Sequence, residues 1–281
     1  MRRDINAGLG RLENGLLFPK TKMPALPNQQ KRNLTVKLPV AASKIKRQSP
    51  STAHIPIDSG LYDNLKEDRK MKLIPTIFAH NKKEFEERFK KILPISKNIQ
   101  IDFMDGKFVK AKSIQPRDIP NLAKFKNNFE AHLMCLHPEK YLSTLKQKGF
   151  KKIFFHFEAT KNPEKILNQI KSLNLTAGIA FNPNAPIKKI IELSNLADVL
   201  LFMGHTPGVE GVSFNPKTLE KIKALRKTNK KIKIQVDGGA SPRIIPKLAK
   251  AGVNYANIGS YVSKSKNPKQ AFKKLNRLCK S

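Results

Sequence analysis

The sequence predicts an α/β fold: a closed (β/α)8 barrel over residues 71–281, preceded by a disordered basic extension over residues 1–70. Beyond position 71, short apolar runs alternate eight times with polar or amphipathic stretches, most of them helical. This is typical of parallel strands joined by crossover helices. Eight such units in about 210 residues match the size of a closed barrel. An open doubly wound sheet is disfavoured because no Gly-x-Gly-x-x-Gly string follows the first strand.

The extension shows no sustained hydrophobic periodicity. It holds six prolines and a basic run at Lys44–Arg47. A segment of this composition buries too little apolar surface to offset the entropy lost on ordering. We therefore predict a flexible segment over residues 1–70 and one barrel domain over residues 71–281.

The predicted strands are short runs rich in apolar and β-branched residues, each bounded by turn or cap residues. In chain order they are Leu73–Ala79, Asn98–Asp102, Phe129–Met134, Lys152–His156, Ala177–Asn182, Asp198–Met203, Lys231–Asp237 and Tyr255–Gly259.

The predicted helices follow all but the second strand, where a long loop stands instead. Proline opens most of them, which suits the first turn because its missing N–H has no partner there in any case. In order, the helices are Lys82–Leu93, Pro138–Lys148, Pro163–Leu173, Pro186–Ser194, Pro216–Lys227, Pro242–Ala251 and Pro268–Cys279.

Three ionisable side chains stand at the ends of predicted strands. Asp102 ends the second strand, His132 lies near the end of the third, and Asp237 ends the seventh. The C-terminal ends of the strands form the active-site face of such barrels. Any one of these residues alone would be an ordinary cap or turn residue. Together they indicate a site where one carboxylate removes a proton from carbon and a second returns it.

Glycines follow the last two strands. Gly238 and Gly239 come after strand seven, and Gly259 and Ser260 after strand eight. These loops commonly bind phosphate through backbone N–H groups. Glycines there can also be plain turn residues, but their presence on adjacent strands favours a phosphate site.

Beyond Met71, the predicted barrel contains three methionines, Met104, Met134 and Met203, and all three fall at or just after the ends of predicted strands. Methionine often fills gaps in cores. At the active-site face, however, thioethers give a polarisable lining that cannot protonate a carbanion.

Together these strings resemble the ribulose-phosphate 3-epimerase family over most of residues 71–281. The matching segments are Gln100–Val109, His132–Met134, Phe155–Ala159, Ala180–Pro183, Pro207–Gly208 with Gly211, Val236–Gly239 and Gly259–Ser260.

The resemblance implies a TIM barrel that acts as an isomerase of carbohydrate metabolism, in the pentose phosphate pathway. It would be a metal-dependent epimerase that inverts C3 of a phosphorylated ketose, D-ribulose 5-phosphate to D-xylulose 5-phosphate, through an enediolate. Asp102 and Asp237 would be the catalytic acid and base. The implied ligands of one divalent metal ion are Gln100, Asp102, His132 and Asp237. The implied substrate-binding residues are Met104, His132, Met134, Met203, Gly208, Gly238, Gly239, Gly259 and Ser260.

Three positions depart from the family pattern. Gln100 stands where the family usually has a histidine ligand, and it can offer only a carbonyl oxygen. This weakens the case for Zn²⁺ relative to Mn²⁺ or Fe²⁺. Ala79 replaces a serine that contacts substrate, and Glu210 replaces a glycine in the loop after strand six.

The net charge is +34, and most of it lies in residues 71–281, where 41 Lys and Arg residues oppose 15 Asp and Glu residues. This field should attract phosphorylated substrates. An alternative interpretation is a catalytically weakened barrel that binds RNA or another anion, and weak nonspecific nucleic-acid binding is expected in either case. The two cysteines and the lack of a long apolar run predict a cytoplasmic protein without membrane contact. A homo-oligomer is a further possibility.

Overall fold

The structure is a computed structural model, which describes residues 70–209 and 211–280. The predicted extension, apart from Lys70, lies outside the described residues, so its disorder and its boundary stay predictions. Glu210 lies outside them as well.

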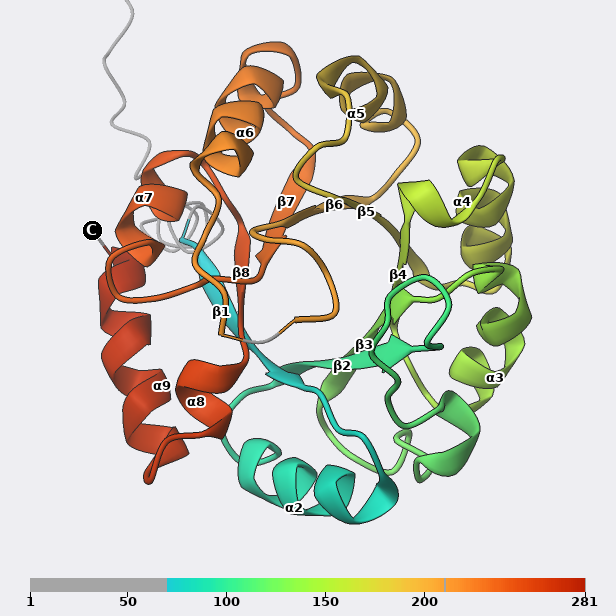
Figure 1. The fold of residues 1–281 in the computed structure, drawn as a ribbon, viewed down its shortest axis with the longest axis vertical. Helices are drawn as coiled ribbons and strands as arrows, with labels where there is room; N and C mark the ends of the chain where they lie inside the picture. Colours follow the sequence, from blue (N-terminus) through green and yellow to red (C-terminus); the bar gives the residue numbers. More distant parts are fainter. Residues whose placement is uncertain (1–69, 210, 281) are drawn as a thin grey trace, which may run out of the picture. The chain divides into compact units, whose positions relative to one another are not determined.

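Eight parallel strands close into a barrel in chain order, and the first strand pairs with both the second and the last. Figure 1 looks into this ring, with helices arranged around it. The predicted fold class is confirmed. The strands are β1 Lys72–Ile77, β2 Asn98–Met104, β3 Asn128–Met134, β4 Lys152–His156, β5 Thr176–Phe181, β6 Val199–Met203, β7 Lys233–Asp237 and β8 Tyr255–Ile258.

The helices follow the strands as predicted, with changes at their ends. They are α2 Lys82–Ile92, α3 Leu142–Gln147, α4 Pro163–Ser172, α5 Ile187–Leu193, α6 Pro216–Thr228, α7 Ile245–Lys250, α8 Ser260–Ser263 and α9 Pro268–Arg277. The region predicted as one helix from Pro138 begins as a 3-10 turn over Pro138–Tyr141, after His137 in the left-handed conformation. The four-residue helix α8 was not predicted from the sequence.

Asparagine caps fix where four of the helices begin. The side chains of Asn81, Asn162, Asn215 and Asn267 each accept a hydrogen bond from a backbone N–H of the first turn. Three of the four are followed directly by proline, so cap and proline together set the start of the helix.

Strand side chains alternate between two environments. Ile99, Ile101 and Phe103 of β2 belong to the large core between the sheet and the helices. A separate cluster inside the barrel consists of Phe154, Ala180, Val199, Leu201 and Met203, and we call it the apolar half of the interior.

Gly178 makes room for one ring of the apolar half. A Cβ at Gly178 would lie 2.1 Å from the Phe154 ring, so glycine on β5 lets that aromatic ring fill the barrel.

Candidate active site

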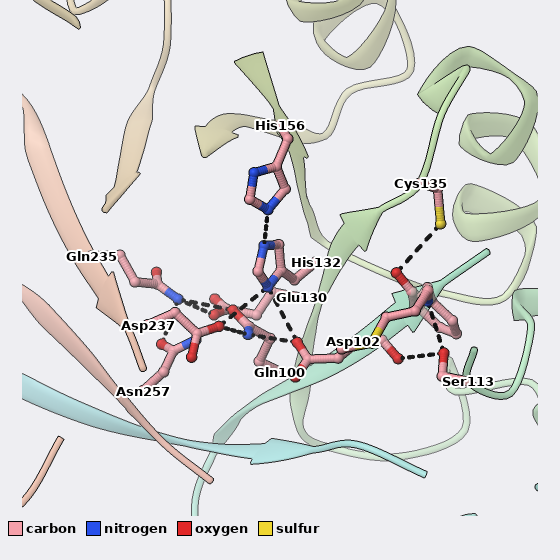
Figure 2. A network of polar contacts seen from close by, with 12 residues as sticks. Gln100, Asp102, Ser113, Glu130, His132, Cys135, His156, Gln235, Asp237 and Asn257 are labelled. Carbon is pink, nitrogen blue, oxygen red and sulfur yellow. Dashed lines mark hydrogen bonds and ion pairs between the residues drawn. The ribbon is translucent and has the colours of Figure 1, made fainter. Parts of the chain in front are cut away.

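Strand register brings the predicted ionisable residues to one level. Asp102 of β2 lies opposite His132 of β3, while Asp237 ends β7 on the far side of the barrel interior. His132 Nδ1 lies 3.3 Å from Asp102 Oδ1 and 3.2 Å from Asp237 Oδ2. Figure 2 shows the imidazole reaching toward both carboxylates. The structure therefore gathers residues separated by up to 135 positions into one cluster.

Burial and close charges shift the pKa values of this cluster. Burial raises the pKa of Asp102 to about 6, and the nearby charge of Asp237 adds to the effect. Burial alone would also raise the pKa of Asp237, but His132 and the Gln100 amide outweigh it, and that pKa is lowered. Burial alone would lower the pKa of His132, yet the two adjacent carboxylates raise it to about 9. Two carboxyl groups of the same type thus have pKa values pushed in opposite directions.

A second histidine, absent from the predicted site residues, supports the first. His132 Nε2 lies 3.0 Å from His156 Nε2, and His156 Nδ1 lies 3.5 Å from Glu158 Oε2. Burial lowers the pKa of His156 to about 4, with the neighbouring His132 adding to the effect. A neutral His156 whose Nδ1–H points to Glu158 presents Nε2 as an acceptor. When His132 loses a proton, this arrangement keeps the remaining one on Nε2 and directs the lone pair of Nδ1 toward the carboxylates.

The donor atoms of Asp102, His132 and Asp237 suit a divalent metal ion. One ligand atom from each lies within 4.8 Å of the others. His132 Nδ1 is buried and makes no well-formed hydrogen bond with any described residue. Two carboxylates and an imidazole are a donor set that Mn²⁺, Fe²⁺ and Zn²⁺ accept.

Gln100 lies beside these three residues, but it points its amide NH2 group at the carboxylates and not the carbonyl oxygen that a metal ligand would present. Its Nε2 donates to Asp102 Oδ1 at 2.9 Å and to Asp237 Oδ2 at 2.6 Å. Its Oε1 accepts from Gln235 Nε2 at 3.3 Å. The sequence predicted a carbonyl ligand, whereas the structure presents the carboxylates with an amide NH2 group.

A cavity of about 800 Å³ opens above the cluster, at the C-terminal ends of the strands. It gathers nearly all the residues predicted to contact substrate, while His132 lies beneath it and is fully buried. The predicted residues that line the cavity are Asp102, Met104, Met134, Met203, Gly208, Asp237, Gly238, Gly239, Gly259 and Ser260.

The two glycines after β7 are required by their backbone and by close neighbours. Gly238 and Gly239 have φ of +100° and +68°, respectively, in the region that favours glycine. A Cβ on Gly239 would lie 2.7 Å from the Phe214 backbone, and one on Gly238 would lie 2.7 Å from the His205 ring. Side chains at these positions would crowd the cavity wall.

Three cationic residues and one hydroxyl at the cavity were missed from the sequence. Arg243, Lys247 and Lys264 line the same cavity as the glycine turns. Thr76 of β1 also lines it, and its hydroxyl is buried without a hydrogen-bond partner among the described residues. The family resemblance placed a substrate-contacting serine at position 79, where this chain has a buried alanine, Ala79. Because strand side chains alternate, Thr76 faces the interior, where such a hydroxyl can reach substrate.

Comparisons with known proteins agree with this geometry. The sequence profile of the Ribulose-phosphate 3 epimerase family matches residues 72–263. A ribulose-phosphate 3-epimerase of Schizosaccharomyces pombe is 29% identical over 209 residues, which cover 73% of this chain and 92% of the relative. A protein of the same name from Eremothecium gossypii is 35% identical over 176 residues, or 58% of this chain and 74% of the relative.

One solved structure with the same fold is more distant in sequence. The structure of a 3-hexulose-6-phosphate synthase aligns with a TM-score of 0.56 at 17% identity, covering 74% of this chain and 99% of that one. This likeness shows the barrel fold. Among the described residues, none of the helices has the length and apolarity needed to cross a membrane.

Proposed function

Because this chain belongs to the ribulose-phosphate 3-epimerase family and is an isomerase of that type, we propose that it interconverts D-ribulose 5-phosphate and D-xylulose 5-phosphate. The observation that carries this assignment is the pair Asp102 and Asp237, two carboxylates at one cavity with pKa values pushed in opposite directions. Such a pair is equipped to act as acid and base in one reaction. We assign the reaction to the cytoplasm.

Inversion at C3 requires a proton to leave one face and another to arrive on the opposite face. One aspartate takes the C3 proton, and the electron pair of the broken C–H bond moves into the C2 carbonyl to give an enediolate. The other aspartate then delivers its proton to the opposite face of C3 as the carbonyl re-forms. In the protein without a metal ion, the lowered pKa of Asp237 favours it as the base, and the raised pKa of Asp102 favours it as the acid. Their protonation states are exchanged after each turnover.

Asp102, His132 and Asp237 would hold one divalent metal ion. When bound, that ion supplies Lewis acidity that makes the proton next to the carbonyl easier to remove. His156 holds His132 in the tautomer that leaves Nδ1 free to bind. Mn²⁺ and Fe²⁺ are our first choices for the ion, and Zn²⁺ is the third.

The remaining cavity residues bind and shield the substrate. Met104, Met134 and Met203 give an aprotic lining over the reacting carbon. The glycine turns after β7 and β8 offer backbone N–H groups to the phosphate. Arg243 and Lys247 add positive charge near that end, and the Thr76 hydroxyl can donate to a substrate oxygen.

Deuterium exchange tests this function. The purified chain is incubated in D₂O with Mn²⁺ or Fe²⁺ and each of a small panel of ketose phosphates. We expect deuterium to be incorporated at C3 of ribulose 5-phosphate and xylulose 5-phosphate to form. Neither result is expected after the metal has been removed by a chelator. Exchange confined to another ketose phosphate would redirect the substrate assignment. No exchange with any member of the panel would contradict the proposal.

A further inference from the structure

A buried chain of polar side chains crosses the barrel beneath the metal ligands. It consists of Lys152 on β4, Glu130 on β3, Gln235 on β7 and Gln100 on β2, and we call it the buried polar chain. Lys152 Nζ lies 2.8 Å from Glu130 Oε2. The Gln235 NH2 group faces three acceptor oxygens: Glu130 Oε1, Asn257 Oδ1 at 2.8 Å and Gln100 Oε1 at 3.3 Å. Figure 2 shows the glutamine amides leading from Glu130 to the aspartates.

The charged end fixes the direction of the Gln235 amide. Glu130 is only 2% exposed and is paired with a lysine, so its carboxylate can accept hydrogen bonds but cannot donate them. The NH2 group of Gln235 must therefore face Glu130. Its Oε1 faces Lys152 Nζ at 3.4 Å, a group that can only donate. Turning this amide around would create an oxygen–oxygen and a nitrogen–nitrogen contact at once.

The direction of Gln235 in turn fixes that of Gln100. Because the Gln235 NH2 group lies against Gln100, Gln100 must present Oε1 to it and its own NH2 group to the carboxylates. The opposite orientation would place two amide NH2 groups against each other. It would also point an amide oxygen at Asp102 and Asp237.

We propose that Lys152, Glu130 and Gln235 are positioning residues that hold Gln100 as a hydrogen-bond donor to both aspartates. The metal ion then has three protein ligands, Asp102, His132 and Asp237. Gln100 sets the position of the two carboxylates and does not bind the ion. This inference rests on the proposed function only in taking the metal to bind at these three residues.

Replacing Gln100 by leucine separates the two roles. Leucine keeps the approximate volume of the side chain but neither donates nor accepts hydrogen bonds. Co²⁺ serves as a spectroscopic probe because its visible absorption responds to its ligands. If Gln100 is a donor, Gln100→Leu should keep the Co²⁺ band positions and weaken Mn²⁺ binding by about tenfold, as for other groups that orient ligands. A changed Co²⁺ spectrum would show a lost ligand and would overturn the proposal, as would a wild-type chain that binds neither ion.

A reciprocal exchange tests the positioning residues themselves. The double variant Glu130→Gln with Gln235→Glu keeps the same two side-chain types and the same net charge. The carboxylate at position 235 can only accept, so Gln100 must turn its NH2 group to it and its oxygen to the metal. We expect the Co²⁺ spectrum of this variant to shift toward that of Gln100→His, which adds a ligand directly. A spectrum unchanged from the wild type would overturn the positioning role.

Folding and function are followed separately in both experiments. Thermal unfolding identifies a variant that no longer folds, and Gln100→Leu remains decisive if the double variant does not fold. Glu84→Gln is a matched control, since it changes a partly buried acid that pairs with Arg88 on α2, outside the buried polar chain and the metal ligands. It should leave the direction of the Gln100 amide, and hence the response to the exchange at positions 130 and 235, unaltered. The wild-type protein could show the Co²⁺ spectrum of a three-ligand site but no deuterium exchange with ribulose 5-phosphate. That result would contradict the proposed substrate and leave this inference standing.

Discussion

The two halves of the barrel interior are built on different principles. The apolar half, Phe154, Ala180, Val199, Leu201 and Met203, comes from β4, β5 and β6 and is held by packing alone. The polar half comes chiefly from β2, β3 and β7 and is joined across the interior by hydrogen bonds and ion pairs. It consists of Gln100, Asp102, Glu130, His132, Gln235 and Asp237.

The difference shows which half determines function. Apart from Met203, which also lines the cavity, a residue of the apolar half needs only the right volume, so its replacement should affect stability. A residue of the polar half needs each partner, because a buried polar group without one costs more free energy than the hydrogen bond contributes. Changes in the polar half should therefore act on metal binding and proton transfer.

The largest expected effect comes from the two aspartates. Asp102→Asn and Asp237→Asn should each lower kcat/KM for epimerisation by at least about 10³-fold, because each removes one of the two proton-transfer groups. Each variant should still exchange the C3 proton of the one epimer whose C–H faces the surviving carboxylate, without inversion. Proton and deuterium NMR on both epimers measures this split.

Asp105→Asn is the matched control for that experiment. Asp105, in the turn after β2, accepts hydrogen bonds from the backbone N–H groups of Lys107 and Phe108 in the same turn and of Leu136 after β3. Its replacement should cost stability, of the order of 1 kcal/mol, and leave inversion in place. Inversion retained in both Asp102→Asn and Asp237→Asn would refute the two-base mechanism.

A change in the apolar half should have a smaller and different effect. Leu201 is completely buried in that cluster. Leu201→Ala should lower the free energy of unfolding by about 2–5 kcal/mol, since it removes apolar contacts and leaves a cavity. The Mn²⁺ affinity of the folded variant should stay within about threefold of the wild type, which calorimetry can measure after denaturant unfolding has given the stability. A much larger loss of metal affinity would mean that the two halves are coupled.

The sequence predicted the positions of the polar residues in the barrel interior but not the orientation of their side chains. Strand alternation and strand ends placed Asp102, His132 and Asp237 at one level, because a parallel barrel brings all carboxyl strand ends to one face. The sequence did not predict the direction of the Gln100 amide, because that direction depends on Glu130 and Gln235, which lie on strands distant in the chain. A prediction of that kind requires the register across the barrel as well as the periodicity along it.

Local rules also failed where tertiary contacts decide the outcome. The family pattern pointed to position 79 as the place of a substrate-contacting hydroxyl that this chain lacks. The hydroxyl that lines the cavity is that of Thr76, because only the strand's inward positions reach it. The short helix α8 follows directly from Gly259 and has no side-chain cap of its own. Nothing in its four-residue pattern distinguishes it from a loop. The support of His132 by His156 likewise appears only when β3 and β4 are paired.

The last prediction, a change in metal affinity of about tenfold per pH unit, tests the electrostatics of the polar half. In the metal-free protein the carboxylates raise the pKa of His132 to about 9, so a metal ion must displace its proton near neutral pH. Apparent Mn²⁺ affinity should therefore rise with pH between 7 and 8.5 and level off above about 9. Below about pH 6 the dependence should steepen, because Asp102, with its pKa raised to about 6, must lose a proton as well. His156 contributes nothing in this range, since its pKa is lowered to about 4 and it is already neutral.

Calorimetry in buffers of different ionisation enthalpy counts the protons released when Mn²⁺ binds. We expect one proton per ion at pH 7.5 and a number approaching two at pH 5.5. A count of zero at pH 7.5 would mean that His132 is neutral before the metal arrives, and that the carboxylates on either side of it do not hold its proton.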